Sequence, residues 1–351
     1  MFKKIWSYKW ILLTVCCFIL LYTLPEHVIE RYYSRGLFLV FRAFFDYTFA
    51  FLPFPAYYLF LLFCVLTLIR WVLGFFRLNP LPPLTRVIRA FSFIGFMVVF
   101  FFLIWGFNYG RTSVEKMLNL NLRPLTTDEL RTETDTVLDQ LHQARLKIKE
   151  DTNTLPQIVF LNNIEDKSRE DLNHVLEKNN YPYSDRLRGR FVFDNLFLIF
   201  SVGGQYMPYV GEGAVDDAVF YSKKPFYVMH EMAHGNGITG EGDCNFWAYM
   251  SCMQSQNVAF QYSGSLNYLF YLLSELKLRD KQQYEEVYKN MPDVIKRDLN
   301  EIKEYDKKHT FFTGFLGDVF NTIYLKIMGV PDGVRNYDKL VLLAYAWRHQ
   351  Q

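Results

Sequence analysis

The sequence lacks a charge imbalance, a cysteine framework and a phosphate-binding loop. Its 38 basic and 36 acidic residues almost balance, so the overall charge does not indicate a nucleic-acid partner. The five cysteines include neither a CxxC nor a CxxxC pair, which argues against a cysteine zinc knuckle. Cys244 and Cys252 would lie about 12 Å apart along one helix, beyond the roughly 7 Å reach of a disulfide. The glycines of residues 235–242 have no lysine and no GKS or GKT ending, which weakens a phosphate loop there.

Apolar stretches, in contrast, are long and frequent, and the 34 phenylalanines and 24 tyrosines crowd the start of the chain. Three segments are long and apolar enough to cross a bilayer, at about 5–24, 55–76 and 88–107. The first is followed by no small-residue cleavage site, so we expect it to be retained rather than removed as a signal peptide. The segment at about 37–54 has charged residues at helical spacing, which favours an interfacial helix over a fourth span.

The distribution of basic residues predicts how these spans are oriented. Lysines lie at residues 3–9, and arginines lie within residues 77–89 between the last two spans. With three spans both groups fall on the cytoplasmic side, which agrees with the positive-inside tendency, whereas a fourth span would place the arginines outside. We therefore expect a membrane region at 1–109 and a domain at 110–351 outside the cytoplasm.

The second region has the patterns of a mixed globular domain. Residues 126–151 begin with a capping sequence and continue with apolar residues at helical spacing, which predicts a helix. The segments PQIVFL at 156–161 and RFVFDNLFLIF at 190–200 are typical of short strands. After Pro225 the pattern is mainly helical. The predicted fold class is membrane-anchored α+β, with a mostly helical domain that contains a small sheet.

The stretch HEMAHGNGITGEGDCNF, residues 230–246, carries the candidate chemistry. His230 and His234 are four residues apart, so a helix would place them on one face, where they can hold one metal ion. Glu231 would project about 100° away from that face. That position beside the metal is the one that a general base for a zinc-activated water requires. The glycines after His234 would break the helix and let the chain turn back.

A catalytic zinc site needs a third protein ligand and an open fourth position. Glu241 and Asp243 are the candidates, at the start of a helix predicted over residues 242–260. Glu241 and Asn245 are four residues apart, so one can bind the metal while the other accepts a hydrogen bond from a ligand histidine. We favour Glu241 as the ligand, although Asp243 stays open. Asp243 is two positions off that face and is expected to cap the helix.

Two further features allow functional interpretations that the sequence leaves undecided. GGQYMPYVGEGAV, residues 203–215, could be an edge strand that pairs with an extended peptide, or a strand that only packs on the histidine helix. Four side chains could stabilise an oxyanion, and the sequence does not select one of them. They are Tyr206, Tyr209, His309 and Tyr337.

HEMAH followed by EGDCNFWAY resembles the gluzincin zinc peptidases, in which a helix with an ExxxD or ExxxN pattern supplies the third ligand. The chain also resembles a family of bacterial three-span membrane proteins catalogued as domain of unknown function 3810. That likeness rests on the same stretch and on FLIWGFNYGR, GQYMPYVGEGAV and YLKIMGVPDGVRNYDKLVLLAY. The chain departs from the family at Cys244, where alanine is usual, and at Gly242 and Asp243, where a more acidic pair is usual.

The resemblance implies a membrane-anchored, zincin-like metallopeptidase of the bacterial inner membrane that cleaves a peptide or protein substrate. Zn²⁺ would be held by His230, His234 and Glu241, with Glu231 as the general base. The alternative is a non-catalytic zinc-binding sensor or assembly factor, in which a Cys244 thiolate closes the site as a fourth ligand. The intact Glu231 favours the enzyme, because a purely structural zinc site needs no base.

Overall fold

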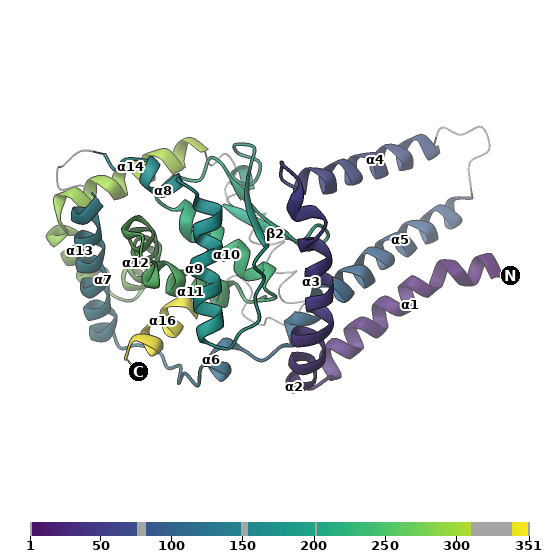
Figure 1. Cartoon of the computed structure of the whole chain (residues 1–351), viewed down its shortest axis with the longest axis horizontal. Coiled ribbons are helices and arrows are strands. Elements are labelled where there is room, and N and C mark those ends of the chain that lie inside the picture. The colour runs from purple at the N-terminus through teal and green to yellow at the C-terminus, as the bar shows by residue number, and fades with distance from the viewer. Residues whose placement is uncertain (1, 76–81, 149–153, 201, 310–338, 350–351) are drawn as a thin grey trace. The chain divides into compact units, whose positions relative to one another are not determined.

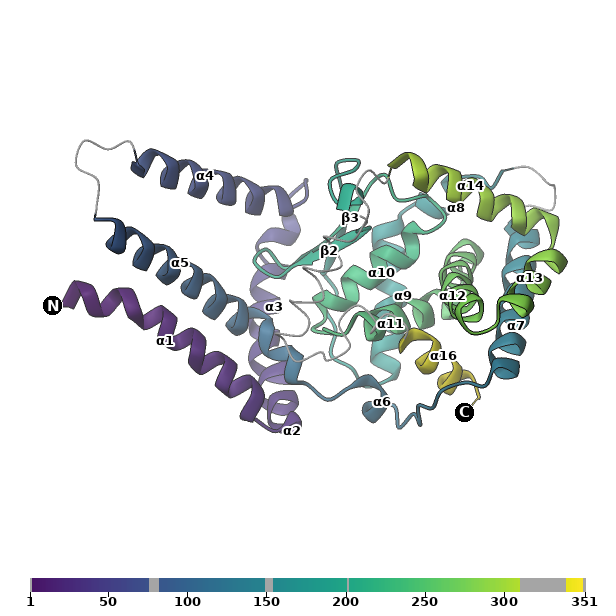
Figure 2. The same ribbon diagram turned by 180° about the vertical axis from the view of Figure 1, so that it is seen from behind.

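The computed structural model describes residues 2–75, 82–148, 154–200, 202–309 and 339–349. Most of this part of the chain is helical, and it contains one small sheet of three strands, as the sequence predicts (Figures 1 and 2). The chain divides into two compact units. The first comprises Met1–Thr112 with Met207–Glu212, and the second comprises Ser113–Tyr206 with Gly213–Gln351.

The first unit consists of helices that follow the apolar segments of the sequence. Its elements are α1 (Phe2–Thr23), α2 (Glu26–Val28), the π-helix η1 (Ile29–Leu37), α3 (Phe38–Asp46), η2 (Phe49–Phe51), α4 (Tyr57–Phe75), α5 (Pro83–Ile104) and η3 (Gly106–Gly110). Among the described residues, two helices could cross a membrane by length and composition, at Tyr57–Gly74 and Pro83–Ile104. The number rises to three if the bent pair Tyr8–Thr23 and Glu26–Phe51, which meet at 111°, forms one span.

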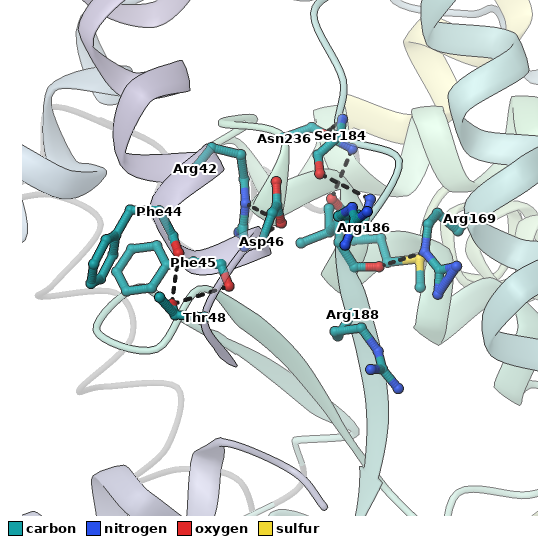
Figure 3. A network of polar contacts seen from close by, with 12 residues as sticks. Arg42, Phe44, Phe45, Asp46, Thr48, Arg169, Ser184, Arg186, Arg188 and Asn236 are labelled. Carbon is teal, nitrogen blue, oxygen red and sulfur yellow. Dashed lines mark hydrogen bonds and ion pairs between the residues drawn. The ribbon is translucent and has the colours of Figure 1, made fainter. Parts of the chain in front are cut away.

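The helix expected at about 37–54 has other bounds in the structure, and two of its charged residues are buried instead of exposed. It belongs to a helical run that begins at Glu26, directly after Pro25, and its α-helical part ends at Asp46. Arg42 and Asp46 are buried, and Nη2 of the arginine lies 2.9 Å from Oδ1 of the aspartate, as Figure 3 shows. Their helical spacing therefore produces an internal ion pair rather than a solvated face.

The second unit contains the sheet and most of the long helices. Its elements are α6 (Val114–Met117), α7 (Thr127–Ile148), α8 (Ile158–Leu161), α9 (Ile164–Lys178), β1 (Arg188–Val192), η4 (Leu198–Phe200), β2 (Gly204–Met207), β3 (Glu212–Asp216), α10 (Lys224–Gly235), α11 (Glu241–Gln254), α12 (Val258–Arg279), α13 (Lys281–Asn290), α14 (Asp293–His309) and α16 (Lys339–His349). In Figures 1 and 2, α10 and α11 lie between the sheet and α12. Their core is aromatic, with Trp247, Tyr262 and Tyr268 fully buried.

Of the two predicted strands, the one at 156–161 is wrong and the one at 190–200 is too long. Residues 158–161 form the helix α8, whose Phe160 packs on Tyr221 and Tyr262; so short an apolar run has no periodicity that separates helix from strand. In the segment 190–200, only the part up to Val192 is a strand. The rest curls around the buried Asp216 carboxylate, which accepts backbone N–H bonds from three residues of the curl and from one that follows Asp216. These donors are Asn195, Phe197, Leu198 and Ala218.

The helix predicted over residues 242–260 is two helices in the structure. α11 ends at Gln254, and α12 begins at Val258 after the N-cap residue Asn257. The Asn257 side chain accepts a hydrogen bond from the Ala259 backbone N–H at 3.0 Å. This cap satisfies one free donor of the new helix and explains the break.

Glycines on the sheet let α10 approach it closely. The strand order is β1–β3–β2, so β2 lies at an edge of this sheet. A Cβ atom on Gly213 of β3 would lie 2.7 Å from Cβ of Glu231, and one on Gly204 of β2 would lie 2.6 Å from its Oε1. On β1, a Cβ atom at Gly189 would lie 2.9 Å from Cε of Met232. Without side chains at these positions, the strands can lie against the helix that carries the histidines.

Candidate metal centre

The buried helix α10 positions both histidines. Pro225 lies in its first turn, where the missing N–H of proline costs no hydrogen bond. The helix ends at Gly235 and the chain reverses through Gly237, whose φ of +81° suits glycine. Asn236, at the end of α10, accepts a hydrogen bond from the Ser184 backbone N–H at 3.0 Å, as Figure 3 shows. The reversal brings the start of α11 back to the histidine face.

The structure brings three potential metal-binding atoms together at this reversal. His230 Nε2 lies 3.2 Å from Glu241 Oε2, and His234 Nε2 lies 3.6 Å from the same oxygen. All three donor atoms lie within 4.8 Å of one another. With bonds of about 2.0–2.1 Å, two corners of a tetrahedral zinc site lie roughly 3.3 Å apart. The spacing of the carboxylate from both imidazoles therefore fits one metal ion.

Hydrogen bonds on the opposite ring nitrogens orient both imidazoles. His230 Nδ1 lies 2.8 Å from Asn245 Oδ1, and Asn245 Nδ2 donates to the Tyr271 hydroxyl at 3.0 Å. His234 Nδ1 lies 2.9 Å from the Ile238 carbonyl oxygen. Both of these oxygens are acceptors, so each Nδ1 carries a hydrogen, and a metal ion that replaces any proton on Nε2 would find the lone pair there. This is the tautomer that a metal ligand requires.

The Glu231 side chain lies against the strands, where its Oε1 would be 2.6 Å from a Cβ atom on Gly204 of β2. Burial raises the pKa of its carboxyl to about 7, against the lowering effect of the two histidines. The carboxylate accepts a hydrogen bond from the Tyr206 backbone N–H. Its Oε2 atom is buried and has no hydrogen-bond partner among the described residues. An unsatisfied buried oxygen is costly, so Oε2 is the carboxylate atom with capacity to bond a ligand.

Asp243 lies in the first turn of α11 and is not its N-cap residue. The N-cap position belongs to Gly240, and Asp243 Oδ2 lies over it, 2.7 Å from where a Cβ atom would stand. Its Oδ1 lies 2.8 Å from Lys339 Nζ in an ion pair. The donor group described above includes Glu241 and not Asp243. The reason is geometric, since two residues along a helix rotate a side chain by about 200°.

Cys244 lies on the far side of His234 from the donor group. Its Sγ is 3.2 Å from His234 Nδ1 and 3.4 Å from the Ile238 carbonyl oxygen. Burial raises the pKa of the Cys244 thiol to about 12, so the sulfur keeps its proton and can donate to that carbonyl. A thiol in this position orients the imidazole and does not reach its Nε2 side.

The structure does not identify which of the four candidate residues would stabilise an oxyanion. The Tyr209 hydroxyl donates to the Met97 carbonyl at 3.1 Å, and His309 Nδ1 lies 3.0 Å from Asn195 Oδ1. Tyr206 is buried, and its backbone N–H donates to the Glu231 carboxylate. Tyr337 lies outside the described residues.

The sequence did not predict the supporting residues that are distant from the motif along the chain. Tyr271 and Lys339 are separated from the motif along the chain. Lys339 falls in the family stretch YLKIMGVPDGVRNYDKLVLLAY, but neither its residue type nor its spacing points to the site. The glycines at 204 and 213 fall within or beside strand patterns, where an isolated glycine signals a close backbone approach. That signal could have predicted that the histidine helix packs against the sheet. It could not have predicted that the Glu231 carboxylate lies at this contact.

The chain belongs to the family described as proteins of unknown function, DUF3810, whose model matches residues 33–345. No curated protein matches the chain, and no solved structure does. Because the family description names no activity, any function must be argued from the site.

Proposed function

We propose that this protein is a membrane-anchored, zinc-dependent metallopeptidase with a gluzincin-like site. The observation that carries the proposal is the convergence of His230 Nε2, His234 Nε2 and Glu241 Oε2 within 4.8 Å. Two neutral imidazoles and one carboxylate are a common ligand set of catalytic zinc, and three protein ligands leave one position open. The hydrogen bonds at both Nδ1 atoms support the same assignment, because they hold the lone pairs toward a single point.

Each residue of the site has a role in this proposal. The metal, when bound, would polarise a peptide carbonyl and make water more acidic. Glu231 would accept a proton from water on Oε2 and deliver it to the leaving amine, while the Tyr206 N–H holds the other carboxylate oxygen. Asn245 and the Ile238 carbonyl would keep both histidines oriented.

The proposed setting is the bacterial inner membrane, with the domain at 110–351 outside the cytoplasm. Two to three helices that could cross a membrane support anchoring. We propose three spans, because that number puts the lysines of residues 3–9 and the arginines of residues 77–89 on the same side. The substrate would be a peptide or protein outside the cytoplasm.

A zinc-binding sensor or assembly factor remains the competing function. Its main support was a possible Cys244 thiolate ligand that would close the site. The thiol lies against His234 Nδ1 instead, which favours an open coordination position and hence the enzyme.

The test separates metal binding from chemistry. The full chain, purified in detergent, would be assayed for zinc content and for cleavage of a mixed peptide library. Glu231→Gln keeps the volume of the side chain but removes the base. Zinc content should stay near wild type while hydrolysis falls by at least about 10²–10⁴-fold.

Glu241→Ala is the matched variant for the metal, and it should lose zinc or bind it far more weakly, because three ligands are needed for a tight site. If Glu231→Gln cleaves peptides at the wild-type rate, the motif is not the catalytic centre. If the wild type binds zinc and cleaves nothing, the sensor is the better interpretation.

A further inference from the structure

A single ammonium group joins three segments of the second unit beside the metal centre. Lys339, the first residue of α16, places Nζ 2.8 Å from Asp243 Oδ1 and 2.8 Å from Glu115 Oε2. Glu115 belongs to α6, and Asp243 belongs to the first turn of α11. The three side chains are largely shielded, with 14–27% of their surfaces exposed. This partial burial strengthens the pairs beyond those of exposed groups.

The first turn of α11 has no side-chain hydrogen bond from its N-cap residue. Its N-cap residue is Gly240, which has no side chain to bond the free N–H groups. The Asp243 carboxylate folds over that glycine and is held there by Lys339. Glu241 lies in the same turn, two residues before Asp243. A shift of the turn would therefore move the Glu241 carboxylate away from the histidines.

We propose that Lys339 is a positioning residue for the candidate metal ligand Glu241. By binding Asp243 and Glu115 together, it holds the first turn of α11 at the distance from which Glu241 Oε2 reaches both imidazoles. The inference rests on the proposed function in one respect, that Glu241 binds the metal.

Charge alone predicts the opposite effect, which makes the inference testable. A lysine near a metal centre repels the cation, so replacing it with methionine should tighten zinc binding if only electrostatics matter. If Lys339 positions the turn, the same change leaves the Asp243 and Glu115 carboxylates facing each other without a counterion. Their repulsion should displace the turn and weaken zinc binding.

The experiment is a double-mutant cycle on zinc affinity, measured by competition with a chromophoric chelator on the full chain in detergent. Lys339→Met and Asp243→Ala should each bind zinc about tenfold more weakly, the low end of the range for groups that orient ligands. The double variant should also be about tenfold weaker, because both changes break the same contact. Lys339→Arg, which retains the charge and can bridge two carboxylates, should bind close to wild type.

Arg145→Met provides the control for general destabilisation. Arg145 on α7 forms a buried ion pair with Asp298 on α14 at 2.7 Å, and neither helix carries a donor of the metal centre. This variant should lower the thermal unfolding temperature with zinc affinity unchanged. Cobalt absorption of Lys339→Met should change in band position if the coordination geometry is disturbed, which a remote structural defect would not cause.

The outcomes separate the inference from the proposed function. Tighter or unchanged zinc binding in Lys339→Met would overturn the inference, as would single effects that simply add in the double variant. If Lys339→Met does not fold, Asp243→Ala decides alone, and wild-type affinity in that variant overturns the inference. A wild-type protein without zinc would overturn the proposed function, and this inference with it.

Discussion

Alanine at Gly213 should disturb Glu231 far more than alanine at Gly189, although both glycines lie on strands that face α10. At Gly213 the new Cβ would stand 2.7 Å from Cβ of Glu231, and 3.2 Å and 3.3 Å from its backbone carbonyl carbon and oxygen. None of these three atoms can move unless the backbone of α10 moves as well. At Gly189 the nearest atoms are Cε of Met232 at 2.9 Å and Cγ1 of Val228 at 3.0 Å, which belong to side chains and not to the helix backbone.

The magnitudes follow from these contacts. Overpacking against a rigid neighbour costs about 1–3 kcal/mol of unfolding free energy, so Gly213→Ala should fall in that range. Neither glycine has a positive φ, so alanine also restricts the unfolded chain, which contributes about 0.4–1 kcal/mol in favour of folding. For Gly189→Ala this gain should offset most of the cost of moving Met232.

Thermal unfolding in detergent tests the difference. For a domain of this size, about 1 kcal/mol shifts the midpoint by roughly 2–4 °C, so Gly213→Ala should melt visibly lower and Gly189→Ala close to wild type. Peptide hydrolysis, if the proposed function holds, should fall in Gly213→Ala because the base is displaced. Equal midpoints for the two variants would refute the close approach of β3 to Glu231.

Four further results are expected. Asn245→Ala should still bind zinc, but about 10–100-fold more weakly, in a chelator competition, since it orients His230; an unchanged affinity would remove it from the site. Cys244→Ala should keep full zinc content by metal analysis, whereas loss of zinc would make the thiol a ligand after all. Acidification should release zinc, because the histidines must be neutral to bind it, and zinc held unchanged at pH 4 would contradict the ligand set. A reporter fused after Gln351 should be active outside the cytoplasm, and clear cytoplasmic activity would overturn the three-span topology.

The sequence by itself determined the structural elements whose residues repeat at a regular spacing along the chain. The helix at 127–148, the helices described after Pro225 and the apolar segments of the first unit follow from residue spacing and length alone. The spacing of four residues also put His230 with His234, and Glu241 with Asn245, on common helix faces. For these features, neighbours along the helix carry the information.

Tertiary structure decided everything that depends on how those helices meet. The reversal through Gly237 selects Glu241 rather than Asp243 to face the histidines, and it places Cys244 against the Nδ1 side of His234. The same limit explains the error at 156–161, where the packing of Phe160 outweighs any propensity of four residues. Lys339 reaches the centre only because α16 packs against α11. Contacts between residues far apart along the chain depend on shape and packing, which residue spacing does not encode.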